Sequence, residues 1–109
     1  MRVVCQKKKL ARIIDDEKLI LKEYGQDIGR KLIQRISELS AANNLSEISH
    51  LGPQFLHLLK GNYKGLFAVT LTGNYRLIFE AYDEQDEITL KKGEATQILI
   101  REVVDYHGN

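Results

Sequence analysis

The sequence predicts an α+β fold, in which an N-terminal strand and an antiparallel helix hairpin pack on a small, mostly antiparallel sheet. Two observations predict it. Apolar residues recur at helical spacing in residues 15–42, and they alternate at strand spacing from residue 54 onward. Helices followed by consecutive strands are typical of an α+β arrangement with the helices on one face of the sheet. A length of 109 residues fits one domain, so we expect a single domain over residues 1–109.

The front of the chain is expected to hold a strand and two helices. Residues 2–6 are mostly apolar and predict the strand. Acidic residues 15–17 suit the N-terminus of a first helix, and Gly25 suits its end. A second helix is expected at residues 27–42, followed by one more helical turn at 45–50. The two-residue link between the helices predicts that they pack antiparallel.

The second helix is predicted to be amphipathic. Its apolar residues recur at intervals of four, four and three, and they are Ile28, Leu32, Ile36 and Leu39. The polar and charged residues occupy the remaining faces, and they are Arg30, Lys31, Gln34, Arg35 and Glu38. We therefore expect one face in the core and the other faces in solvent.

The second half of the chain predicts the sheet. Alternating apolar residues favour strands at residues 66–72 and 75–81, joined by a tight turn around Gly73. In the second of these strands Arg76 is expected to point away from the helices. A long charged loop is expected at residues 82–94. The last strand, at residues 96–104, is apolar on both faces, which is typical of an interior strand.

Composition limits the compartment and the kinds of site. Cys5 is the only cysteine, which excludes an intramolecular disulfide and a cysteine-based zinc site. No apolar run resembles a signal peptide or approaches the ~18 residues of a membrane span. We therefore expect a cytoplasmic protein with no membrane association.

Charge is balanced overall but unevenly distributed. The chain has 16 basic and 15 acidic residues and a net charge of +1, so net charge alone predicts no nucleic-acid binding. Residues 56–76 are basic with no acidic residue, whereas residues 80–87 hold five carboxylates. This separation indicates a local anion site. The alternative is that both segments are ordinary solvated surface.

Few residues are suited to catalysis, and the common signatures are absent. The sequence has no Walker A loop, no dinucleotide-binding glycine pattern and no nucleophile elbow. His50, His57 and His107 have no metal-ligand spacing, so no metal or cofactor is expected. Any chemistry would have to come from side chains alone.

Three groups of residues remain as candidates, each with a simpler alternative. Asp105-Tyr106-His107 follows a strand, and a carboxylate there could orient a histidine that transfers protons; a frayed polar end is the alternative. His57 lies among apolar residues, where a lone histidine is more often a satisfied core or interface residue. Arg76 is suited to clamping a phosphate, and a salt bridge to Glu80 or to a neighbouring strand is the alternative.

With these residues assembled, the chain resembles the HigB-like toxins of bacterial toxin–antitoxin modules, in the RelE/ParE superfamily. The resemblance covers nearly the whole chain. It rests on the helical front half with Tyr24-Gly25, on His57-Leu58-Leu59-Lys60-Gly61, on the strand pair at 66–72 and 74–79, and on the terminal Asp105-Tyr106-His107.

The resemblance implies a RelE-like fold and a ribosome-dependent endoribonuclease that cuts mRNA in the decoding site without a metal. It also implies a cognate helix-turn-helix antitoxin as partner. The residues that correspond to catalytic positions are His57, Arg76, Asp105, Tyr106 and His107. Lys60 corresponds to a phosphate-contacting lysine, and Lys64 in the same basic segment is a second RNA-binding candidate.

The expected reaction is attack of the 2′-OH on the neighbouring phosphate. His57 or His107 would accept the proton, and Arg76 would stabilise the charge on the phosphoryl oxygens. Tyr106 would stack on a base or orient the phosphate.

Two alternatives stay open. ParE-like members of the superfamily poison DNA gyrase and lack the histidine-rich set, and a third possibility is a non-catalytic module that only binds a partner. The net charge of +1 is low for docking on ribosomal RNA. Nuclease activity would therefore need a basic face, formed by Arg30, Lys31, Arg35 and residues 57–76, with the acidic segment turned away.

Overall fold

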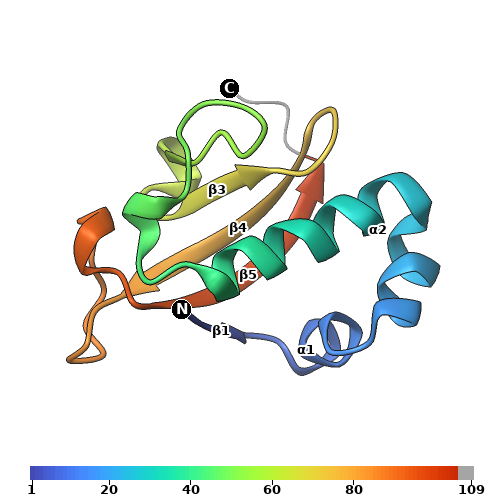
Figure 1. The fold of residues 1–109 in the computed structure, drawn as a ribbon, viewed down its shortest axis with the longest axis horizontal. Coiled ribbons are helices and arrows are strands. Elements are labelled where there is room, and N and C mark those ends of the chain that lie inside the picture. The colour runs from blue at the N-terminus through green and yellow to red at the C-terminus, as the bar shows by residue number, and fades with distance from the viewer. Residues whose placement is uncertain (106–109) are drawn as a thin grey trace.

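The computed structural model describes residues 1–105. The elements, in which η marks a 3-10 helix, are β1 (Arg2–Cys5), α1 (Lys8–Ile14), α2 (Glu17–Ala41), η1 (Leu45–Glu47), β2 (His57–Leu58), η2 (Gly61–Tyr63), β3 (Phe67–Thr70), β4 (Tyr75–Tyr82), η3 (Lys92–Glu94) and β5 (Gln97–Asp105). The helices precede all strands but β1, which confirms the predicted α+β class (Figure 1). In this described range, no helix has the length and apolar character needed to cross a membrane.

The described strands form one mixed sheet in the order β1-β5-β4-β3-β2. β1 runs parallel to β5, and the other neighbouring strands are antiparallel. β5 therefore lies inside the sheet, between β1 and β4, as its apolar residues on both faces predicted. The sheet is mostly antiparallel, which confirms the expectation from the sequence.

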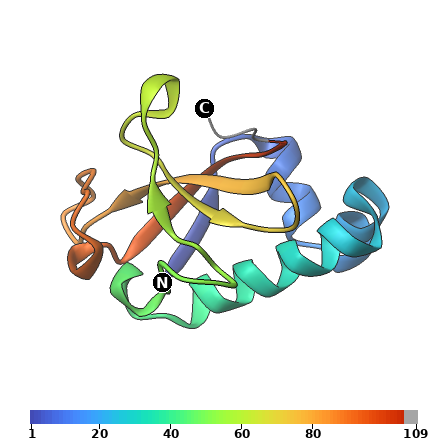
Figure 2. The same cartoon turned by 90° about the horizontal axis from the view of Figure 1, so that it is seen from above.

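The main core lies between α2 and the sheet face that α2 covers (Figure 2). The predicted alternation in β4 is confirmed, because Leu77 and Phe79 belong to this core while Ile78 belongs to a separate cluster. The rings of Phe67 and Phe79 stack on neighbouring strands, with their centroids 6.0 Å apart. Burial of these apolar side chains is the main stabilising contribution to the fold.

The opposite face of the sheet is only partly exposed. Its small cluster of Leu59, Ala68 and Ile78 is buried, and Tyr63 and Leu66 pack against it. These two residues belong to the segment around η2, which Figure 2 shows on the side of the sheet away from α2. The covered part lies toward the middle of β4, so the beginning of β4, where Arg76 lies, remains accessible to a ligand.

The helices begin and break at the residues that local chemistry predicts. Asp16 caps α2 by accepting a hydrogen bond from the backbone N–H of Lys18 at 2.9 Å. Gly25 interrupts α2 with φ 81° and ψ 176°, a conformation that glycine adopts without steric cost. The two segments of α2, before and after Gly25, contact each other where Gly29 packs against Leu21.

The first helix, α1, was missing from the sequence prediction. The predicted start of the first helix at residues 15–17 corresponds to the start of α2, not to that of α1. α1 has seven residues, of which Leu10 is buried and Ile13 and Ile14 are half-buried against the core. Seven residues make about two turns, which give too few apolar positions to show a helical period.

Arg35 corrects the prediction that the charged residues of the second helix face solvent. Its side chain is 1% exposed. Nε donates to the carbonyl oxygen of Thr70 at 2.9 Å, and Nη2 donates to that of Pro53 at 3.2 Å. Nη1 pairs with the carboxylate of Glu38 at 3.1 Å. Arg35 therefore ties α2 to the end of β3 and to the loop before β2, and it cannot contribute to a basic surface.

Candidate functional site

A cavity of about 490 Å³ opens on the side of the sheet away from α2, at the turn between β3 and β4. Its lining residues come from the loop before β2, from β2 itself and from the β3–β4 hairpin, and they are His50, Phe55, His57, Thr70, Gly73 and Arg76. His57 and Arg76, two of the residues singled out in the sequence, therefore line the same cavity.

The strand register explains this meeting. His57 pairs with Ala68, and Arg76 pairs with Thr70 two residues further along β3. Ala68 lies in the cluster on the face away from α2. Because side chains two apart on a strand share a face, His57 and Arg76 both point to that face. Two chain segments 19 positions apart in the sequence thus supply one site.

The imidazole of His57 is held in one tautomer. Its Nδ1 lies 2.8 Å from the backbone oxygen of Phe55. A carbonyl oxygen can only accept a hydrogen bond, so Nδ1 carries the proton and donates it. Nε2 of the neutral ring is then left with its lone pair, as a general base requires. His57 is exposed, which contradicts the alternative that it is a core residue.

The guanidinium of Arg76 lies over the turn of its own hairpin. Nη1 donates to the carbonyl oxygens of Gly73 at 2.9 Å and Tyr75 at 3.1 Å. Its Nε is buried and has no hydrogen-bond partner within the described part of the chain. The alternative of a salt bridge to Glu80 is wrong, because the Glu80 carboxylate pairs with Arg101. A buried donor without a partner is costly.

None of the remaining predicted site residues that the structure describes lines the cavity. Lys60 and Lys64 are exposed at the two ends of η2, outside the lining of the cavity. Asp105 is exposed at the end of β5 and pairs with Tyr75, one residue beyond the pair of Val104 with Arg76. Tyr106 and His107 lie outside the described residues. The structure therefore brings the end of β5 to the strand position beside Arg76.

His50 and Phe55 line the cavity but were not predicted as site residues. In the sequence, His50 has no metal-ligand spacing, and Phe55 is one of several apolar residues around His57. The loop that carries them has no regular period, so no pattern indicated where they point. The spacing of two residues between Phe55 and His57 gives no such signal either, because Phe55 is not in an extended conformation.

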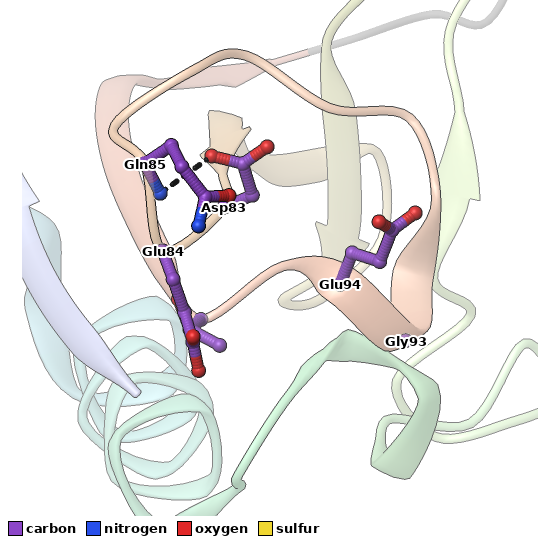
Figure 3. Close-up of a pocket in the computed structure, with 6 residues that line it drawn as sticks. Asp83, Glu84, Gln85, Gly93 and Glu94 are labelled. Carbon is purple, nitrogen blue, oxygen red and sulfur yellow. Dashed lines mark hydrogen bonds between the residues drawn. The ribbon is translucent and has the colours of Figure 1, made fainter.

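The acidic segment lies at the other end of β4. Arg76 is the second residue of this strand, and the loop that follows Tyr82 forms a separate pocket lined by Asp83, Glu84, Glu94 and neighbouring residues (Figure 3). Asp83 folds back to accept a hydrogen bond from the backbone N–H of Gln85 at 2.9 Å. Six strand residues separate the two ends by about 20 Å. The carboxylates of this pocket therefore lie far from the cavity of His57 and Arg76.

The hydrogen bond between Tyr82 and Glu80 predicts that the stability of the fold depends on pH. Tyr82 Oη donates to Glu80 Oε2 at 2.6 Å, and this bond, with burial as a smaller cause, raises the pKa of Tyr82 above its ordinary value of 10.0. A phenol that holds its proton more tightly in the folded chain stabilises the fold fully below about pH 10, and this stabilisation is lost as the pH rises through the raised pKa.

We therefore expect Tyr82→Phe to lower the free energy of unfolding at neutral pH. The difference from wild type should shrink at pH values above the raised pKa. Urea unfolding of both proteins on either side of about pH 10 measures it. A difference that stays constant across that range would contradict the proposed bond.

Comparisons with known proteins agree with this fold. The chain matches the family model described as the RelE-like toxin of type II toxin–antitoxin system HigB over residues 5–91. This region includes His57 and Arg76 and ends before β5. No curated protein sequence gives a significant match.

Two similar solved structures are toxins or contain one. The YoeB/ParE toxin from Agrobacterium tumefaciens is 14% identical with a TM-score of 0.53, over 94% of this chain and 95% of that chain. The YoeB-YefM complex from Staphylococcus aureus is 14% identical with a TM-score of 0.55, over 98% of this chain and 97% of that chain. These structures show a shared fold. The family match spans most of the sequence, and the chain therefore belongs to the HigB-like family of RelE-like toxins of type II toxin–antitoxin systems.

Proposed function

We propose that the protein is a ribosome-dependent endoribonuclease that cuts mRNA in the decoding site, with the cavity of His57 and Arg76 as its active site. One observation supports this most: His57 offers a proton-accepting nitrogen in the same cavity as the Arg76 guanidinium. Cleavage of RNA by its own 2′-OH needs a base for the hydroxyl proton and a cation for the phosphoryl oxygens. mRNA cleavage is also the general activity that RelE-like toxins imply.

The reaction needs no other nucleophile. The 2′-oxygen attacks the adjacent phosphorus in line, and its proton passes to Nε2 of His57. As the new O–P bond forms, the bond from phosphorus to the 5′-oxygen breaks, and a general acid protonates the departing oxygen. The products carry a 2′,3′-cyclic phosphate and a 5′-OH. Arg76 stabilises the negative charge that builds on the non-bridging oxygens.

The end of the chain is assigned the remaining roles. His107 supplies the proton for the leaving oxygen, since His57 already serves as the base, and Asp105 orients a histidine. Tyr106 stacks on a base of the RNA. Lys60 and Lys64, exposed on η2, contact phosphates further along the strand. The pairing of Asp105 with Tyr75, next to the pair of Val104 with Arg76, supports a role for the end of β5 at this site.

The partners follow from the same proposal. A toxin of a type II module has an antitoxin as its counterpart, which we propose to be a helix-turn-helix protein. The second partner is the ribosome with mRNA in its decoding site, which places the toxin in the cytoplasm. Its near-neutral net charge is compatible with RNA docking because the cavity of Arg76 lies at the start of β4, whereas the pocket of Asp83, Glu84 and Glu94 follows the other end of this strand.

Replacing His57 by alanine is expected to slow cleavage of ribosome-bound mRNA by about 10²- to 10⁴-fold, because the 2′-OH then loses its base. Added imidazole should restore part of the rate, since a small base can occupy the vacated space. Single-turnover cleavage of a defined mRNA on purified ribosomes measures both effects. A His57→Ala protein that cuts at the wild-type rate would remove His57 from the mechanism.

A further inference from the structure

Phe55 presents an aromatic ring to the cavity that holds His57 and Arg76. The side chain is 48% exposed, although phenylalanine is usually buried. A phenyl ring has no charge and forms no conventional hydrogen bond. Any ligand contact that Phe55 makes must therefore come from its apolar face. The ring shares the cavity with one cation and one imidazole.

The backbone holds Phe55 in an unusual position. Its φ is 49°, in the left-handed region that bulky residues rarely adopt. Its N–H donates to the carbonyl oxygen of Leu51 at 3.0 Å. The residues on either side are also fixed, because Thr70 donates to the carbonyl of Gln54 at 2.8 Å and Leu56 donates to that of Ser49 at 2.9 Å. The surrounding structure thus imposes this conformation, as it does on strained residues at functional sites.

The ring is placed as firmly as the backbone. A Cβ built on Gly52 would lie 2.9 Å from Cζ of Phe55, so the ring rests on the bare glycine. The carbonyl of Phe55 also accepts the Nδ1 proton of His57. One residue therefore sets the position of an aromatic face and the tautomer of the neighbouring imidazole.

We propose that Phe55 is a stacking platform for an unpaired RNA base next to the phosphate held by Arg76; this rests on the proposed nuclease function. An aromatic face beside a guanidinium matches the two parts of a nucleotide, a flat base and an anionic phosphate. Every base has a face that can stack, so the platform contributes affinity and position without selecting one base. The substrate it fits is single-stranded RNA with a base turned out of its own stack.

The test measures cleavage kinetics and stacking separately. Ribosomes are programmed with an mRNA that carries 2-aminopurine in the decoding-site codon, and stacking on the platform quenches its fluorescence. For this measurement a 2′-O-methyl group at the cleavage position blocks the reaction. The variants are Phe55→Leu, which removes the aromatic face, and Phe55→Tyr, which keeps it. Leu51→Ala is the matched control, because Leu51 is 62% exposed in the same loop and does not line the cavity.

We expect Phe55→Leu to raise KM by about tenfold, to leave kcat within about twofold of wild type and to abolish the quenching. Phe55→Tyr and Leu51→Ala should behave like wild type. Circular dichroism checks that Phe55→Leu folds, and Phe55→Met replaces it if it does not. An unchanged KM and quenching in the folded aliphatic variant would overturn the proposal.

Two other outcomes would also overturn it. Equal losses in Phe55→Leu and Phe55→Tyr would mean that the aromatic face is not what matters. A fall in kcat alone would mean that Phe55 only positions His57. If wild type does not cleave at all, the nuclease proposal fails, and the quenching, which needs no cleavage, still decides whether Phe55 binds a base.

Discussion

Replacing Arg76 by alanine is expected to reduce the rate of mRNA cleavage by about 10²- to 10³-fold, which is the typical cost of removing one donor aimed at a developing anion. The Arg76 guanidinium lines the cavity with His57, and its Nε has no partner within the described residues. Since Nη1 donates to the Gly73 turn, we expect the edge of the guanidinium that faces the cavity to contact the phosphoryl oxygens. Single-turnover cleavage of ribosome-bound mRNA is the measurement.

Two further variants separate chemistry from folding. Arg76→Lys keeps the charge but loses the planar fork of donors, so it should recover only part of the rate. Arg12→Ala removes an exposed arginine of α1 that lies outside the cavity and outside the basic face, and it should cleave like wild type. Because Nη1 of Arg76 also holds the Gly73 turn, thermal unfolding of each variant is measured alongside. An Arg76→Ala protein that is folded and fully active would remove Arg76 from the site.

Replacing Arg35 by methionine is expected to lower the free energy of unfolding by about 2–4 kcal/mol, because each hydrogen-bond acceptor left without its donor costs about 1–3 kcal/mol. Methionine keeps most of the volume but none of the donors. The carbonyls of Thr70 and Pro53 would lose the hydrogen bonds from Arg35, and Glu38 would lose its ion pair and keep the hydrogen bond from Gln34. A small domain has a total stability of about 5–15 kcal/mol, so this loss is large.

Urea unfolding measures the effect of Arg35→Met directly. Arg30→Ala, on the same helix but exposed, serves as the control and should change stability by less than about 0.5 kcal/mol. A loss below about 1 kcal/mol for Arg35→Met would show that the buried guanidinium does not hold the loop before β2 to α2. Since Thr70 also lines the cavity, a destabilised Arg35→Met protein should lose activity as well.

The regular parts of the fold could be predicted because they repeat. Strand alternation in residues 75–81 correctly placed Leu77 in the core and Arg76 on the opposite face. The apolar run at the end of the chain correctly predicted an interior strand. Gly25 correctly marked a break between helical segments. Each of these conclusions depends only on local period or on one backbone preference.

The unpredicted parts depend on tertiary contacts. Arg35 resembles its exposed neighbours in the sequence, and only the carbonyls of two distant segments explain its burial. Phe55 takes a left-handed conformation in an irregular loop, which no pattern indicates. His57 and Arg76 were selected together by resemblance to a family, whereas the strand register supplies the physical reason that they meet.

The most direct test of the proposed function is to map the ends of a defined mRNA after incubation with the toxin and purified ribosomes. The proposal predicts a single cut in the decoding-site codon, with a 2′,3′-cyclic phosphate and a 5′-OH at the new ends. One 2′-deoxy nucleotide at the cut should block it, and Arg76→Ala should leave the mRNA whole. An intact mRNA with wild-type toxin that still arrests growth, accompanied by gyrase-linked DNA breaks, would contradict the proposal.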